Sequence, residues 1–159
     1  MTAEPAVSLV EMTDDELATW LPGAVDRFVA TRVSAGESSE QATVGGEAQR
    51  ERSFPGGRPL PGHHVLHVVA GDNRVGAVWI SPGPGAESSD RHVIVLELDE
   101  AHRGAGRHRA AVLAAERWAV DDGATRLALA VFGRDEGLEA SYAELGYVVA
   151  ATSMFKQLD

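Results

Sequence analysis

The chain has 159 residues, no cysteine and a formal net charge of −10 at pH 7. This length fits one domain with its own hydrophobic core, and the lack of cysteine excludes disulfides, thiolate metal sites and a cysteine nucleophile. Binding a nucleic-acid backbone needs clustered Lys and Arg, whereas the basic residues here are scattered, so we expect no nucleic-acid partner.

Neither the N-terminus nor the apolar runs indicate export or membrane insertion. Residues Met1–Pro5 contain an acid and a proline where a signal peptide needs basic residues followed by an apolar run. The longest apolar stretches, such as Val93–Leu96 and Leu127–Phe132, are far shorter than the roughly 20 residues of a membrane-spanning helix. We therefore expect a cytoplasmic protein without membrane contact.

The first third of the chain predicts one strand and two helices. Val7–Met12 has the composition of a short strand, and Thr13–Glu16 has the T-x-x-E spacing of a helix start. We expect Pro22–Gly23 to kink or split the helix that follows. A second, weaker helix is predicted to start at Ser38–Gln41 and to be interrupted by Gly45–Gly46.

Strands dominate after a loop at Phe54–Gly62, which is too rich in proline and glycine for regular structure. His64–Ala70 and Arg74–Ser81 are β-rich runs joined by Gly71–Asn73, a hairpin signal. A second loop is expected at Pro82–Asp90. Further elements are predicted in the order strand 93–98, helix about 104–121, strand 126–132, helix about 135–145 and strand 147–155.

The segment Arg103–His108 is a glycine-containing turn between a strand and a long helix. Glycines just before a helix let a phosphate approach the unpaired N–H groups at its N-terminus, although an ordinary tight turn would look the same. A dinucleotide-binding G-x-G-x-x-G is excluded because the third glycine position is Arg109. A P-loop is excluded because its G-x-x-x-x-G-K-[ST] pattern is absent.

Leu96–Gly106, followed by a long helix, resembles the signature segment of the GNAT N-acetyltransferase superfamily. The family pattern is Q/R-x-x-G-x-G/A. Val131–Asp135 and Tyr142–Tyr147 are similar to the family's next strand, its Asn-led loop and its tyrosine helix, and the match covers roughly residues 64–158.

The resemblance implies one α/β domain over residues 1–159, with a mixed, mostly antiparallel sheet of about six to seven strands flanked by about four helices. Residues 1–61 would supply the first strand and the acceptor-side helices, and residues 62–159 the sheet core with the coenzyme A site. It also implies acetyl-CoA as co-substrate, a primary amine of a small molecule or protein as acceptor, and direct transfer between them. We leave a homodimer open.

In this family two central strands splay apart and pantetheine inserts between them, and the backbone N–H at the Leu98 position polarises the thioester carbonyl. By the same resemblance the cofactor-binding residues are Arg103, Gly104, Ala105, Gly106, Arg107, His108 and Asp135.

Two side chains are candidates for proton transfer. Tyr142 matches the tyrosine that protonates the leaving thiolate, but it also lies at helical spacing with Leu138 and Leu145 and could be a core aromatic residue. Glu97 interrupts an apolar strand and could act as a base for the acceptor ammonium through water. Equally, Glu97 could be solvated or paired with an arginine.

The chain departs from the family in one region. His108 replaces a Gly or Ala, Asp135 replaces an Asn, and Leu138 and Ser141 replace residues that are usually Ala and Leu. The alternative function is therefore a degenerate domain that binds acyl-CoA or a partner without catalysis. No metal site is expected. The three neighbouring histidines interpreted as structural or surface residues are His63, His64 and His67.

Overall fold

A computed structural model describes residues 6–83, 89–104, 106–133 and 135–158. It has one five-stranded sheet in the order β1-β2-β3-β4-β5, in which only the β4–β5 pair is parallel. The helices and strands are β1 (Val7–Glu11), α1 (Asp14–Ser34), α2 (Ser39–Ser53), β2 (His64–Ala70), β3 (Asn73–Pro82), β4 (Asp90–Leu98), α3 (Arg107–Asp121), β5 (Arg126–Leu129) and α4 (Glu136–Glu144), with short 3₁₀ turns at Pro55–Gly57 and Glu100–His102.

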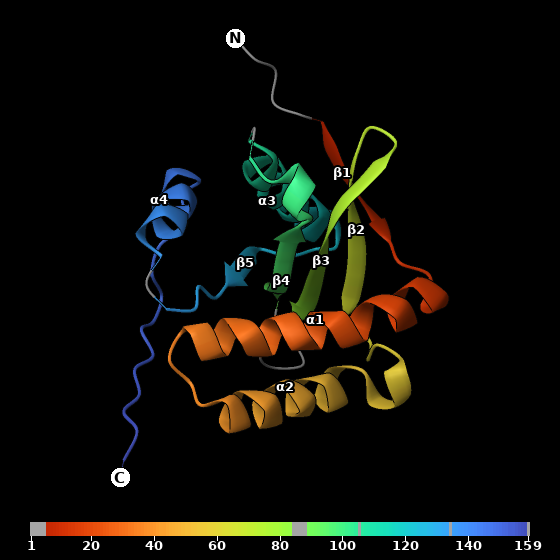
Figure 1. The fold of residues 1–159 in the computed structure, drawn as a ribbon. Helices are drawn as coiled ribbons and strands as arrows, with labels where there is room; N and C mark the ends of the chain where they lie inside the picture. Colours follow the sequence, from red (N-terminus) through yellow and green to blue (C-terminus); the bar gives the residue numbers. More distant parts are fainter. Residues whose placement is uncertain (1–5, 84–88, 105, 134, 159) are drawn as a thin grey trace.

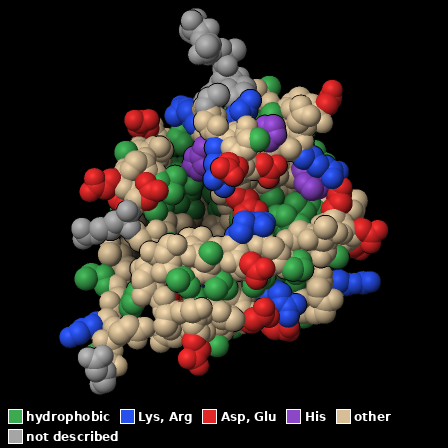
Figure 2. All heavy atoms as spheres, in the orientation of Figure 1, with side chains coloured by type: hydrophobic (Ala, Val, Ile, Leu, Met, Phe, Trp, Pro, Cys, Tyr) green, Lys and Arg blue, Asp and Glu red, His purple; other side chains and the backbone are tan. Residues whose placement is uncertain are grey.

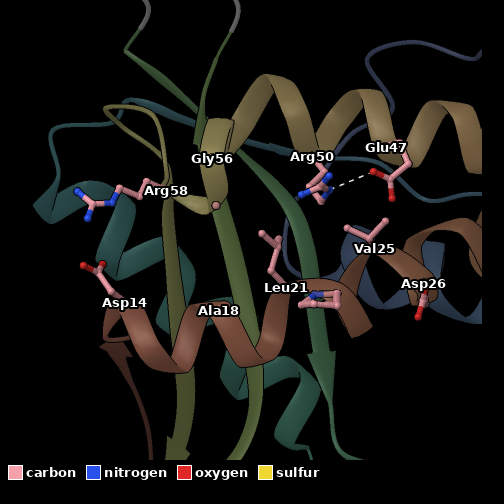
Figure 3. A pocket seen from close by; sticks show the side chains of 11 residues that line it. Asp14, Ala18, Leu21, Val25, Asp26, Glu47, Arg50, Gly56 and Arg58 are labelled. Atoms are coloured by element: carbon pink, nitrogen blue, oxygen red, sulfur yellow. Dashed lines mark hydrogen bonds and ion pairs between the residues drawn. The ribbon is translucent and has the colours of Figure 1, made fainter.

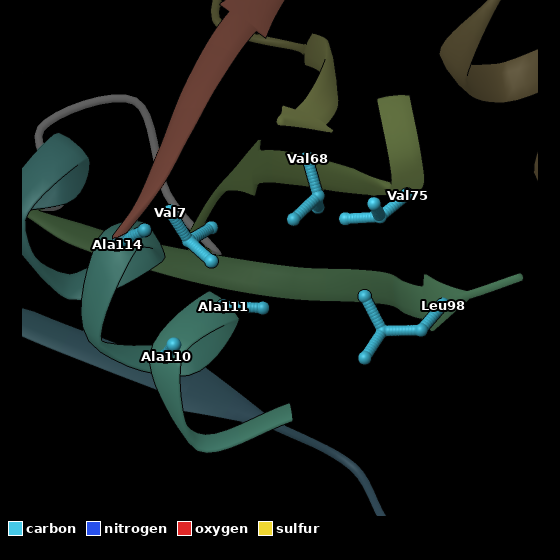
Figure 4. Close-up of a cluster of buried hydrophobic side chains, with 7 residues drawn as sticks. All are labelled: Val7, Val68, Val75, Leu98, Ala110, Ala111 and Ala114. Carbon is cyan, nitrogen blue, oxygen red and sulfur yellow. The ribbon is translucent and has the colours of Figure 1, made fainter. Parts of the chain in front are cut away.

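The sheet is covered by helices on both faces. Helices α1 and α2 lie on one face and α3 on the other, while α4 lies beyond β5 (Figure 1). Alternating strand residues divide between these two layers because successive side chains point to opposite faces. Val65 and Trp79 pack with α1, whereas Val68 and Leu98 pack with the alanines of α3 (Figure 4). The ends of β4 and α3 are therefore held in one hydrophobic core.

Helix α1 starts at the predicted capping box. The Thr13 hydroxyl accepts a hydrogen bond from the Glu16 N–H, and the Glu16 carboxylate accepts one from the Thr13 N–H. Of the two outcomes predicted at Pro22–Gly23, a kink or a split, the split does not occur, since Asp14–Ser34 is a single helix with Pro22 inside it. Leu21 and Ala24 are buried on either side of Pro22, and this packing holds the helix together where a backbone hydrogen bond is missing.

Helix α2 also runs through its predicted interruption. Gly46 is buried against α1, where a Cβ atom in its place would lie 2.6 Å from Cγ2 of Val29. The glycine therefore serves close packing of α1 on α2 rather than a break in the helix. As predicted, the Ser38 side chain caps this helix by accepting a hydrogen bond from the Gln41 N–H.

The prediction of six to seven strands is wrong, because the described residues form five. The chain after α4 has no regular structure in residues 147–158, although a strand was predicted over 147–155. Val148 and Val149 are exposed, and the segment instead runs past the α1–α2 connection, where Gln157 donates a hydrogen bond to Gln41 (Figure 1). A β-rich run forms a strand only where it meets a sheet edge, and this segment does not meet one.

Candidate functional site

Strand β4 has an open edge over its second half. Its pairing with β5 is confined to Asp90–Val93 opposite Arg126–Leu129, although the β5 strand was predicted to extend to Phe132. Within the described part of the chain, Ile94–Leu98 has no strand partner on this side. Backbone donors and acceptors at this edge are available to an extended ligand, as the resemblance predicted for splayed central strands.

The N–H of Leu98 points toward this open edge. Asp99 donates its N–H to the Val75 carbonyl of β3, with 2.8 Å between nitrogen and oxygen. Leu98, one residue earlier and opposite Gly76, therefore belongs to a pair that exchanges no hydrogen bonds across β3 and β4. Its N–H and carbonyl face away from β3, and the carbonyl accepts a hydrogen bond from Nε of Arg103 at 3.1 Å.

The predicted glycine turn leads directly into α3. Gly104 and Gly106 have φ values of 90° and 72°, a left-handed conformation that favours glycine. Gly106 is the N-cap of α3, which has no side-chain cap among the described residues. Among the described residues, a Cβ atom at either glycine would meet nothing within 4 Å, so a ligand could approach this backbone closely. Ala105 lies outside the described residues.

The arginines of the turn contact nearby backbone. Arg103 holds the end of β4 through the Leu98 carbonyl, and Nη1 of Arg107 lies 3.4 Å from the His102 carbonyl. Both contacts leave donors of the guanidinium group unused, because each group carries five N–H donors. The turn thus combines an uncapped helix N-terminus with two cations, which is an arrangement suited to phosphate.

Tyr142 and His108 meet across α4 and α3. The hydroxyl of Tyr142 lies 3.4 Å from Nε2 of His108, and the two rings pack edge to face with centroids 5.6 Å apart. Tyr142 is 9% exposed, and burial raises the pKa of its hydroxyl above the ordinary value of 10. Burial lowers the pKa of His108 below 6.5, so its imidazole is neutral at pH 7. Sequence reasoning missed this contact because the two residues are 34 positions apart.

Asp135 is the N-cap of α4. Its Oδ1 atom accepts a hydrogen bond from the Leu138 N–H at 2.9 Å. Asp and Asn are both good N-cap residues, so capping alone explains a short polar residue at position 135. This explanation holds whether or not Asp135 also contacts a cofactor. The carboxylate also complements the positive end of the α4 dipole.

Glu97 is paired with an arginine, a contact that one of the sequence-based alternatives included. Its Oε2 accepts from Nε of Arg27 at 2.8 Å, and its Oε1 accepts from Nη2 of Arg27 at 2.6 Å and from the Trp20 indole at 3.2 Å. Glu97 is the main cause of a raised pKa for Arg27. Trp20 and Arg27 were not predicted as neighbours of Glu97, although their spacing of seven residues places both on one face of α1.

A pocket of about 540 Å³ lies between α1, α2 and the turn that follows α2. Leu21 and Val25 of α1 line it, as do Glu47 and Arg50 of α2 (Figure 3). No residue predicted to bind cofactor or transfer a proton lines this pocket. It is therefore separate from the open edge of β4.

The described residues provide no group of three or more His, Asp or Glu side chains that could hold a metal ion. His64 pairs with Glu11, and His67 lies 3.1 Å from Glu16.

Among the described residues, no helix is both long and apolar enough to cross a membrane. Charged side chains of both signs are intermixed on the face shown in Figure 2 despite the net negative charge.

The chain matches the model of the acetyltransferase (GNAT) family over residues 33–147. It is 28% identical over 155 residues to YdgE of Bacillus subtilis (strain 168), an uncharacterized N-acetyltransferase, covering 96% of this chain and 99% of YdgE. The fold is similar to YycN from Bacillus subtilis, with a TM-score of 0.84, 24% identity and coverage of 96% and 99% of the two chains. It is also similar to the aminoglycoside N-acetyltransferase AAC(6')-Iy in complex with CoA, with a TM-score of 0.56, 13% identity and coverage of 99% and 98%. Because the family model covers most of the sequence, the chain belongs to the GNAT acetyltransferase family.

Proposed function

We propose that this protein moves an acetyl group from acetyl-CoA to a primary amine of a small molecule or protein by direct transfer. The observation that supports it most is the open edge of β4, where the Leu98 N–H faces outward just before the uncapped start of α3. Acetyl-CoA would supply the activated acyl group as a thioester. The remaining chemistry falls to the residues of this chain.

The α3 turn is suited to hold the pyrophosphate of acetyl-CoA. The first turn of α3 carries the positive end of the helix dipole, and its first N–H, that of Arg107, donates to the Gly104 carbonyl at 3.1 Å. Arg103 and Arg107 would add charge at the same place, and the glycines at 104 and 106 leave room for the phosphates. His108 is the second residue of α3 and Asp135 is the N-cap of α4, and we retain both as proposed cofactor contacts.

Binding can be tested by the melting temperature of the protein with acetyl-CoA. At a ligand concentration of about 100 times Kd the expected stabilisation is about 2.7 kcal/mol, which corresponds to a rise of roughly 5–10 °C. Arg107→Gln should reduce this rise, whereas Arg117→Gln, the same change further along α3, should leave it unchanged. No rise at millimolar acetyl-CoA would contradict the proposed function.

Leu98 and Tyr142 are proposed to act on the two ends of the thioester. The Leu98 N–H would donate to the carbonyl oxygen as negative charge develops on it, a role that needs a fixed backbone donor. Tyr142 would give its proton to the leaving sulfur. Its raised pKa keeps the hydroxyl protonated throughout the neutral range, which an acid needs.

Glu97 is proposed to take the acceptor's proton through a water molecule. Its Oε2 atom accepts one hydrogen bond from the described residues and retains a lone pair for water, whereas both lone pairs of Oε1 are engaged. Arg27 and Trp20 would hold the carboxylate in place on the α1 face of β4.

We expect Glu97→Gln to lower kcat by about 100-fold, because it removes a general base. Arg27→Gln should lower kcat by less than about tenfold, since the carboxylate remains. Steady-state rates at saturating acetyl-CoA measure both. Equal losses in the two variants would indicate instead that the ion pair only ties α1 to β4.

A further inference from the structure

His108 is the point at which this chain departs from the family pattern inside its own signature turn, and its side chain is directed at the proposed acid. It is the second residue of α3, and its Nε2 lies 3.4 Å from the hydroxyl of Tyr142 on α4. The family's usual Gly or Ala at this position could make no such contact. The substitution therefore has a specific partner.

The burial and the neighbours of Tyr142 determine how easily its hydroxyl can lose a proton. Tyr142 is buried, and a buried phenol is a weaker acid because its phenolate is poorly solvated. Tyr147 also packs edge to face against Tyr142, with ring centroids 5.4 Å apart. Burial and then Glu116 of α3 raise the pKa of Tyr147, so that neighbour is also a neutral phenol at pH 7. Among the described residues, His108 is the group whose side chain lies within hydrogen-bonding distance of the Tyr142 hydroxyl.

We propose that His108 is a positioning residue whose Nε2–H donates a hydrogen bond to the Tyr142 oxygen. This inference rests on the proposed function, because it assigns Tyr142 the role of acid. The donated bond leaves the Tyr142 proton free for the substrate and stabilises the phenolate that remains once the proton has gone. Hydrogen bonds in ligand-free sites are often long and shorten in the reacting complex, which fits a separation of 3.4 Å.

One C–N bond forms and one C–S bond breaks in the proposed transfer. The amine nitrogen forms a bond to the carbonyl carbon, the C–S bond breaks with its electron pair on sulfur, and the Tyr142 proton moves to that sulfur. The acceptor ammonium first gives one proton through water to Glu97, which releases it to solvent, and the nitrogen loses its second proton by the same route once the C–N bond has formed. Solvent returns one proton to the Tyr142 phenolate. The His108 imidazole keeps its own proton throughout and remains neutral.

The tautomer of His108 can be measured without any turnover. A long-range proton–nitrogen spectrum of the full chain at pH 7.5, assigned by comparison with His108→Gln, separates the two neutral forms. Protonation at Nε2 is expected. The opposite tautomer, with its proton on Nδ1, would overturn the proposal even if the enzyme transfers acetyl groups.

Measurement of kcat in His108 variants is the second test of the proposal. At saturating acetyl-CoA, His108→Ala should lower kcat by roughly tenfold or more, the size of a hydrogen bond to a charged group. His108→Gln should restore most of the loss because its amide can donate. In a Tyr142→Phe background His108→Ala should have less than a twofold effect. Full additivity of the two changes would overturn the positioning role, whereas absence of transfer by the wild-type protein would refute the proposed function and leave the tautomer as the test.

Discussion

Tyr142→Phe is expected to lower kcat by about 100-fold or more while the KM for acetyl-CoA stays within about twofold of wild type. The change removes one hydroxyl, and loss of a general acid typically costs 10²- to 10⁴-fold. The phenyl ring keeps the contacts that bury Tyr142, so the melting temperature should change little. Thiol release at saturating acetyl-CoA measures the rate.

Tyr147→Phe is the matched control for this experiment. Its ring packs against Tyr142 with centroids 5.4 Å apart, and it loses the same hydroxyl. It has no proposed contact with substrate, so its kcat should remain close to that of wild type. A Tyr142→Phe protein with a normal rate would show that Tyr142 is only a core aromatic residue, the alternative that its helical spacing also allowed.

Gly76→Ala is expected to destabilise the protein by about 3 kcal/mol, with a melting temperature lower by roughly 10 °C. A Cβ atom at this position would lie 2.1 Å from the Glu97 carbonyl oxygen and 2.9 Å from Cα of Leu98, both backbone atoms. Gly76 stands opposite Leu98 in the pair where antiparallel strands approach most closely. Strands β3 and β4 would have to separate where the proposed oxyanion donor is held.

Gly137→Ala provides a control with the same chemical change. Its nearest contact would be Oδ1 of Asp135 at 3.6 Å, which is ordinary van der Waals distance. Ala is favoured over Gly inside a helix, so this variant should be neutral or slightly more stable. Thermal unfolding of both proteins measures the difference. A Gly76→Ala protein as stable as Gly137→Ala would contradict the close β3–β4 pairing described above.

Local sequence patterns predicted the elements whose hydrogen bonds join residues close together in the sequence. The Thr13–Glu16 capping box, the hairpin turn between β2 and β3 and the helix after the glycine turn all lie where the sequence placed them. Each depends on residues a few positions apart, so spacing carries the information. The α/β class, which the family resemblance implied, agrees with the order of these elements.

Features that depend on distant contacts could not be predicted in this way. The segment 147–155 has strand composition, but no local signal says whether a sheet edge will receive it. From the sequence alone, Pro22 and Gly46 are predicted to interrupt helices. Only the packing of α1 on the sheet and on α2 shows why both helices continue through them. Arg27 is 70 residues from Glu97, so its pairing with that carboxylate was beyond any spacing argument.

The sequence likewise predicted some residues of the proposed site but not the contacts between them. The turn before α3 has a signature, and Tyr142 has a family counterpart, so both could be named from sequence. His108 could be noticed only as a departure, because its contact with Tyr142 depends on how α4 lies against α3. Contacts of this kind decide what the residues can do, and they are set by tertiary packing rather than by pattern.

The most direct test of the proposed acetyl transfer is release of CoA thiol from acetyl-CoA by the wild-type protein with a panel of amines. A monoamine, a diamine, an amino acid and a lysine-containing peptide cover the acceptor classes left open, and mass spectrometry identifies any acetylated product. We predict amine-dependent thiol release with one class and a matching product. Saturable binding of acetyl-CoA without release above hydrolysis for any amine would contradict catalysis and favour a domain that only binds acyl-CoA.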